Sequence, residues 1–206
     1  MRHPKANEKD GFLFLGNHLA LDFLNTRPVR NGKTTELLPD FKVLLRWFQA
    51  AGLLSPLDLA RFQKKWGNSV RARRTVKAVR ELREKLRKQV VAWERGEVVQ
   101  VSTVRQLNKL MAQYPMRNKL ESERNRSTIE RWFELRQPED LYAPLAYSAA
   151  TLFAEADRRR IRKCAQCVGH FQDTSKKGTR RWCSMRLCGN RLKVAAYAAR
   201  QRWEAS

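Results

Sequence analysis

The longest regular pattern of apolar residues runs from about Val70 to Trp93. Six apolar side chains recur there at steps of three and four residues, the spacing of one face of an α-helix: Val76, Val79, Leu82, Leu86, Val90 and Trp93. The segment therefore predicts a long helix with one buried stripe and an outer surface of mostly Arg and Lys. Two Glu–Lys pairs four residues apart, Glu81–Lys85 and Glu84–Lys88, are expected to form ion pairs on that outer surface.

Capping residues indicate the ends of further helices. Asp40 precedes an apolar stretch that stops near Gly52, and Ser55-Pro56 opens the next helix, with Pro in the first turn where its missing N–H costs nothing. Shorter helices are predicted at 102–113 and 138–156. The opening segment 12–26 mixes apolar and polar positions and is compatible with either a strand or a helix.

A β-hairpin is predicted over 116–135, with its two arms meeting near Arg124-Asn125-Arg126. The basic run at 158–163 marks the expected boundary between two domains. We place the first domain at 1–157 and the second at 158–206. The whole is expected to be mainly α with small β-hairpins, an α+β protein.

Charge sets this chain apart more than its hydrophobicity does. Of its 206 residues 42% are hydrophobic, close to a globular average, whereas 43 Lys and Arg face 20 Asp and Glu for a formal net charge of +23. The excess is concentrated at 61–100 and 161–206, which carry +9 each. This distribution argues against an acidic solvating protein and against one that handles cations, and it favours a polyanionic partner, nucleic acid before membrane lipid.

The sequence gives no sign of export or of a membrane span. Residues 1–10 are polar, and the apolar run that follows is interrupted by Asn17, His18 and Asp22. No stretch approaches the roughly 20 apolar residues that a span needs. We expect a cytoplasmic protein with no membrane partner, in which thiols stay reduced.

All four cysteines lie in one short window, as C-x2-C followed by C-x4-C: Cys164, Cys167, Cys183 and Cys188. Paired cysteines across short loops are typical of a tetrahedral zinc site, and a four-thiolate shell leaves no open position for catalysis. The order of knuckle, hairpin and helix predicts a treble-clef finger holding one structural zinc ion, with Phe171 and Trp182 packed around it. Disulfides and unrelated free thiols are the alternatives, and His170 is an alternative ligand that we favour less than a place in the hairpin.

Basic residues surround the cysteines, and no acidic residue occurs from Thr174 to Trp203. A solvated charged surface normally interleaves Glu with Lys, so this pattern favours nucleic-acid contact through phosphates. Asn190 and Arg191 are the candidates for contacts with base edges. The predicted nucleic-acid-binding residues are Lys176, Lys177, Arg180, Arg181, Arg186, Asn190, Arg191, Lys193, Arg200 and Arg202.

Two sequence signatures resemble known families. Arg181-Trp182-Cys183-Ser184-Met185 and Cys188-Gly189-Asn190-Arg191-Leu192-Lys193, with Phe171-x-Asp173-x-Ser175 upstream, resemble the CGNR zinc finger. The segment from Gly16 to Thr26 resembles the opening G-x-L-x-L-D-F-x-N-T signature of the ABATE domain, with Asn17 as an extra residue. The likeness implies a stress-induced bacterial transcriptional regulator, in which a helical N-terminal domain senses a ligand and a treble-clef finger binds DNA.

Three polar residues interrupt the apolar run of that N-terminal signature. His18, Asp22 and Asn25 are four and three residues apart and would share one face of a helix. They are candidate binding residues for a small molecule, but a buried hydrogen-bond network that fixes the domain is the reading we favour.

The same sequence features allow functions other than DNA binding. The basic helix near 70–95 would serve structured RNA as well as DNA, so an RNA-associated or protein-interaction module is the alternative. His170 and Asp173 are residue types found in nuclease active sites. However, the sequence shows no further His and carboxylate residues that would converge on a second metal site, so we expect no enzyme. The protein is expected to be a monomer or a homodimer, the latter binding two half-sites.

Overall fold

The computed structural model describes residues 8–30, 33–123, 126–190, 194 and 201. The chain opens with two small antiparallel strand pairs that flank a short helix: β1 (Glu8–Lys9) with β2 (Phe12–Leu13), α1 (Leu19–Leu24), then β3 (Val29–Arg30) with β4 (Lys33–Thr34). The ambiguous segment 12–26 therefore contains a strand and a helix in turn. Every residue of α1 is buried, so its six positions show no amphipathic period.

Four helices follow at the predicted places, and the predicted caps of the first two are confirmed: α2 (Phe41–Ala50), α3 (Pro56–Trp66), α4 (Val70–Glu94) and α5 (Val101–Gln113). The Asp40 carboxylate accepts the Val43 N–H at 2.9 Å, and the Ser55 hydroxyl accepts the Asp58 N–H at 3.0 Å. Each cap satisfies a donor that the first helical turn would otherwise leave unpaired.

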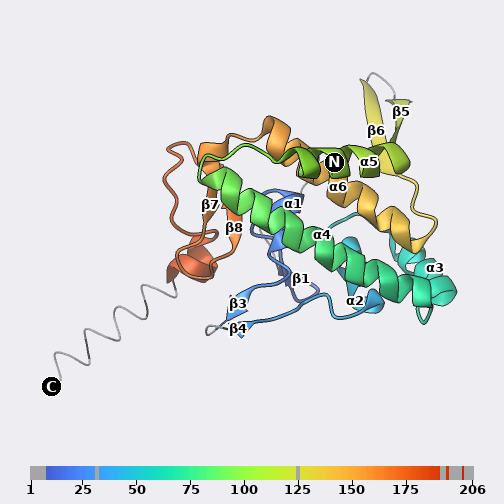
Figure 1. The fold of residues 1–206 in the computed structure, drawn as a ribbon, viewed down its shortest axis with the longest axis horizontal. Coiled ribbons are helices and arrows are strands. Elements are labelled where there is room, and N and C mark those ends of the chain that lie inside the picture. The colour runs from blue at the N-terminus through green and yellow to red at the C-terminus, as the bar shows by residue number, and fades with distance from the viewer. Residues whose placement is uncertain (1–7, 31–32, 124–125, 191–193, 195–200, 202–206) are drawn as a thin grey trace.

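The long helix α4 crosses the body of the protein, and helices α1, α2 and α5 pack against it (Figure 1). Its predicted stripe from Val76 to Trp93 is buried in the main hydrophobic core. The outer surface differs from the prediction, because Glu84 pairs with Arg83, Arg87 and the distant Arg27 rather than with the lysine four residues on.

The predicted hairpin is confirmed as β5 (Met116–Glu123) and β6 (Arg126–Phe133), which pair in register with Leu120 opposite Ile129. Figure 1 shows this ribbon projecting from the body beyond the end of α5. Nearly all of its described side chains are exposed.

The last part of the body returns to helix and then enters the finger. A short 3₁₀ turn, η1 (Pro138–Leu141), leads into α6 (Tyr142–Glu155), which packs on α1 and α5. The finger contains η2 (Arg158–Arg160), β7 (Ile161–Lys163), β8 (His170–Gln172) and the π-helical turn η3 (Met185–Gly189). The structure confirms the α+β class, and none of the described helices is long and apolar enough to cross a membrane.

Candidate metal centre and nucleic-acid interface

The four cysteine sulfurs converge on one point. Each Sγ lies within 4.8 Å of the others, with 3.7 Å between Cys167 and Cys183 and 3.6 Å between Cys183 and Cys188. A tetrahedral ion with Zn–S bonds of about 2.3 Å needs sulfurs about 3.8 Å apart, and a disulfide needs about 2.0 Å. The cluster therefore fits one tetrahedral ion, and all four thiols are free of disulfides.

The first cysteine pair sits on a tight knuckle at the tip of the β7–β8 hairpin. The Val168 N–H donates to the Cys164 carbonyl at 3.0 Å, and the Cys164 N–H donates to the Gly169 carbonyl at 2.8 Å. Val168 adopts φ 52°, a left-handed conformation that is uncommon for a β-branched residue. The knuckle is thus held in a strained shape that turns both sulfurs toward the second pair.

The second pair lies where the chain begins a helical turn, with Cys183 just before η3 and Cys188 within it. The Ser184 hydroxyl accepts the Leu187 N–H at 3.3 Å, and the Ser184 carbonyl accepts the Cys188 N–H at 2.9 Å. A small apolar cluster surrounds the sulfurs. It contains Phe171 and Trp182, as predicted, and also Leu187 and, from the N-terminal segment, Leu15. His170 is a strand residue, and its Nδ1 lies 2.9 Å from the Glu94 carboxylate instead of joining the sulfur cluster.

The thiols cannot all ionise together without a cation. Hydrogen bonding to neighbouring thiols lowers the pKa of Cys164 and raises that of Cys183. Burial raises the pKa of the Cys188 thiol to about 12. A divalent ion would remove this conflict by pairing with the thiolates, and its binding would release protons.

Asp173 braces the loop between the two cysteine pairs. Its buried carboxylate accepts the Ser175 N–H at 2.9 Å and the Arg180 N–H at 2.8 Å. Burial acts to raise the pKa of Asp173, but the hydrogen bonds from Ser175 and Arg180 outweigh it and hold that pKa below its usual value. The aspartate of the F-x-D-x-S element is therefore a charged anchor for the loop.

The free edge of β8 is covered by the N-terminal segment. The Asn25 side chain donates to the His170 carbonyl and accepts the His170 N–H, both at 2.8 Å. Farther along the edge, the Gly16 carbonyl accepts the Gln172 N–H at 2.8 Å, and the Asn17 amide donates to the Gln172 carbonyl at 2.9 Å. The finger hairpin is therefore completed on its open side by residues about 150 positions earlier in the chain.

Two family models match nearly all of the chain. The model of the CGNR zinc finger matches residues 160–201, and the ABATE model, described as "Putative stress-induced transcription regulator", matches residues 17–156. The chain belongs to the ABATE family. The comparison with curated proteins found no match. With four clustered cysteines in a CGNR finger, the cofactor of this ABATE protein is one structural zinc ion.

The three polar residues of the ABATE signature lie at the ends and on the buried face of α1. His18 caps the helix with its Nδ1 accepting the Ala20 N–H at 3.3 Å, and the buried Asp22 accepts the Gly16 N–H at 2.7 Å. Asn25 holds the finger, as described above. Each has a structural partner, which agrees with the hydrogen-bond network; ligand binding by these residues stays a prediction.

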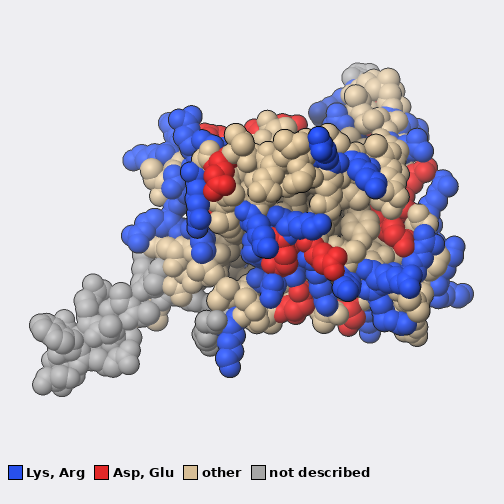
Figure 2. All heavy atoms as spheres, viewed as in Figure 1, with Lys and Arg blue, Asp and Glu red and all other residues tan. Residues whose placement is uncertain are grey.

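Side chains predicted to contact nucleic acid gather on the finger, seen at the left of Figure 2. The exposed ones are Lys176, Lys177, Arg181, Arg186 and Asn190. Arg180 is half-buried, and its guanidinium donates to the Cys183 carbonyl at 2.7 Å. The positions of Arg191, Lys193, Arg200 and Arg202 lie outside the described residues.

The structure adds three exposed basic residues to this surface, namely Arg158, Arg159 and Lys163. In the sequence they mark only a domain boundary, because their place beside the zinc site depends on how the β7–β8 hairpin folds back. Arg160 and Arg162 in the same run instead donate to carbonyls of the 173–178 loop. The two ends of the run thus face solvent, and its middle, from Arg160 to Arg162, faces the finger interior.

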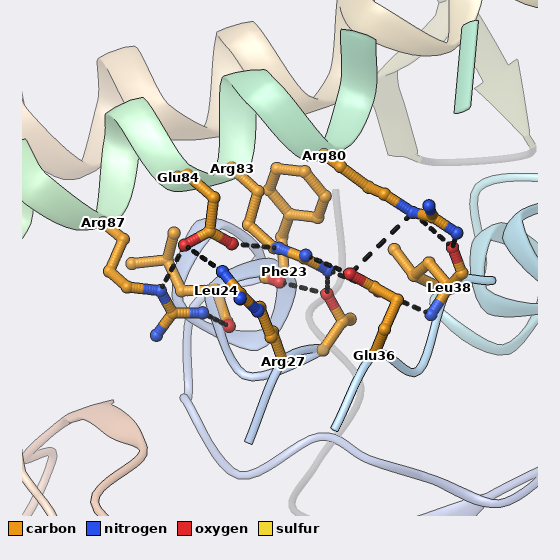
Figure 3. A network of polar contacts seen from close by, with 10 residues as sticks. Phe23, Leu24, Arg27, Glu36, Leu38, Arg80, Arg83, Glu84 and Arg87 are labelled. Carbon is orange, nitrogen blue, oxygen red and sulfur yellow. Dashed lines mark hydrogen bonds and ion pairs between the residues drawn. The ribbon is translucent and has the colours of Figure 1, made fainter. Parts of the chain in front are cut away.

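A separate arginine network ties α4 to the N-terminal segment (Figure 3). Arg83 is only 1% exposed, and it bonds to both oxygens of Glu36 at 2.9 and 2.5 Å and to Glu84 at 2.9 Å. Arg80 and Arg87 donate to the Leu38 and Leu24 carbonyls. A depression of about 570 Å³ lies over the network, and the network residues that line it, among them Glu36, Arg83 and Glu84, are already paired with one another. The network therefore joins α4 to the 24–38 segment and stabilises the fold of the ABATE domain.

Proposed function

We propose that this ABATE protein is a cytoplasmic, DNA-binding transcription regulator whose finger holds DNA through its phosphates. The observation that supports this most is the exposed basic surface of the finger, where Lys176, Lys177 and Arg181 lie on a loop that has Asp173 as its single acidic residue. That carboxylate is buried and fully engaged in bracing the loop, so it does not offset the surface charge.

Rigidity is the second support. The zinc site, the Asp173 anchor and the covered edge of β8 fix the loop from three sides, so basic side chains are presented from one shape rather than from a flexible tail. Preorganised cations lose less conformational entropy on binding, and each phosphate they neutralise releases counterions. Binding should therefore be strong at low salt and fall steeply as salt rises.

The test is binding of the zinc-loaded protein to duplex DNA over a series of salt concentrations. The K176Q/K177Q variant should reduce the slope of log K against log salt by about 1.8, because each phosphate contact contributes about 0.9. The control is K64Q/K65Q, which removes two lysines exposed on α3 and should leave the slope unchanged. Undetectable or salt-insensitive binding would reject the proposal.

RNA binding is the second candidate, since α4 presents exposed basic side chains along its length, including Arg74, Lys77, Lys85 and Lys88. Structured RNA is recognised by shape and phosphate spacing, for which such a helix is suited. Competition between duplex DNA and structured RNA separates the two candidates. We further propose that the protein is not an enzyme, and a nuclease assay with added divalent metal tests this.

A further inference from the structure

The β5–β6 ribbon has unpaired edges on both sides. In the part of the chain that the structure describes, β5 and β6 form a sheet of two strands only, each eight residues long. Such a ribbon is marginally stable by itself and offers a row of backbone donors and acceptors for pairing with another strand. Apolar side chains are exposed on it too, with Leu120 69% and Ile129 56% exposed.

The charges on β5 are ordered about its centre. Both basic residues, Arg117 and Lys119, precede Leu120, and both acidic residues, Glu121 and Glu123, follow it. The strand M-R-N-K-L-E-S-E therefore has opposite charges at equal distances from Leu120. When a strand pairs antiparallel with itself about a two-fold axis, positions at equal distances from the centre face each other.

We propose that β5 pairs with β5 of a second copy of this chain, antiparallel and centred on Leu120, to form a continuous four-stranded sheet. In this register Lys119 of each copy lies opposite Glu121 of the other, and the two Leu120 side chains meet. Asn118 lies opposite Ser122, so small polar residues flank the charged pairs. Each basic position before the centre thus faces an acidic position after it.

The lysine and glutamate are free to make these contacts. Lys119 Nζ lies 2.9 Å from Glu121 Oε1, with Glu130 opposite Lys119 on β6, and the Lys119 and Glu121 side chains are 62% and 40% exposed. An exposed pair of this kind contributes little to stability, so exchanging it for a pair across a dimer costs little.

The β6 edge lacks this symmetry. Its sequence R-S-T-I-E-R-W-F carries two basic residues and one acidic residue, so in any antiparallel self-pairing at least one Arg of each copy has no acidic partner. A second copy also suits β5 better than nucleic acid does, because the exposed carboxylate of Glu121 lies beside Lys119 on this strand. In a chain of net charge +23, a contact between copies requires such a locally balanced surface.

Sedimentation velocity of the full, zinc-loaded chain over a range of concentrations tests the proposal. The unsubstituted chain should dimerise, and K119E and E121K should each raise the dimer dissociation constant about 30-fold, because two attractive cross-strand pairs become two repulsive ones. R131E is the matched control, since Arg131 is exposed on β6, away from the proposed contact, and should leave the dissociation constant unchanged.

Mixing the two weakened variants distinguishes the contact between chains from damage to the ribbon. In a mixed dimer the strand of K119E is acidic at both positions and that of E121K is basic at both, so all four charged positions are paired again. An equimolar mixture should therefore dimerise as tightly as the unsubstituted chain. A chain that stays monomeric, variants that dimerise like the unsubstituted chain, or a mixture that stays monomeric would each overturn the proposal.

Discussion

Replacement of Asn25 by Ala should detach the finger hairpin from the N-terminal segment. The side chain makes two hydrogen bonds of 2.8 Å to the peptide groups of His170, a residue that is 2% exposed. Removing it leaves one buried N–H and one buried C=O without these partners. At about 1 to 1.5 kcal/mol for each, Asn25→Ala should lower the free energy of unfolding by about 2 to 3 kcal/mol.

Urea unfolding of the zinc-loaded protein measures this loss, which should appear as a midpoint lower by about 1 M with an unchanged m-value. Native-state hydrogen exchange localises it, because protection of the His170 amide should fall by roughly 50-fold. Asn25→Asp should lie between Asn25→Ala and the unsubstituted chain in severity: it keeps an acceptor for the His170 N–H but turns a carboxylate oxygen toward the His170 carbonyl. Asn118→Ala, on the exposed ribbon, is the control and should change stability by less than about 0.5 kcal/mol.

A residue whose task is to bind a small ligand gives the opposite pattern. Asn25→Ala would then leave the urea midpoint and the His170 protection unchanged. That result would refute the edge-covering role and return the ABATE signature to the ligand-binding hypothesis.

Three further predictions concern the zinc site and the arginine network. Zinc affinity, measured by competition with a chelator, should fall by tenfold or more per pH unit on acidification, because protons compete for thiols such as Cys188, whose pKa burial raises to about 12. Asp173→Asn should weaken zinc binding by roughly tenfold at pH 7 in the same assay, since it loosens the loop joining the cysteine pairs; equal affinities would contradict this. Glu36→Gln should destabilise the protein to urea by about 2 kcal/mol at pH 7, because it leaves the buried Arg83 short of a counter-charge, whereas Glu81→Gln on the exposed face should have little effect. Burial acts to raise the Glu36 pKa, but Arg83 holds that pKa below its usual value. The stabilisation by this carboxylate is therefore fully present above about pH 4.3, the usual pKa of Glu. As pH falls further, the difference in stability between Glu36→Gln and the unsubstituted chain should shrink.

Local patterns predicted the elements whose causes are local. The caps at Asp40 and Ser55, the stripe on α4 and the β5–β6 hairpin each depend on residues a few positions apart, and the structure confirms them. The four zinc ligands could also be predicted from the sequence, because two cysteine pairs at short spacing are typical of a zinc site.

The remaining contacts are made between residues far apart in the sequence, and the spacing of residues along the chain does not predict such contacts. Glu84 was expected to pair with Lys88 four residues on, but Arg27 and the buried Arg83 lie closer to it in space. The signature residues of α1 look alike in the sequence as polar interruptions of an apolar run. Only the folded chain distinguishes Asn25, which reaches a strand 145 positions later, from His18, which caps its own helix.

The seam along β8 has a consequence for dissecting the protein. A finger cut away at residue 158 would keep its zinc ligands but would lose the residues that satisfy the backbone of its outer strand and the Leu15 side chain in its apolar cluster. The isolated finger would then expose an unpaired strand edge and would be prone to self-association, so it would not be an independent DNA-binding module. Transplanting it onto another scaffold would require carrying the stretch from Leu15 to Asn25 along with it, as a graft of two discontinuous pieces.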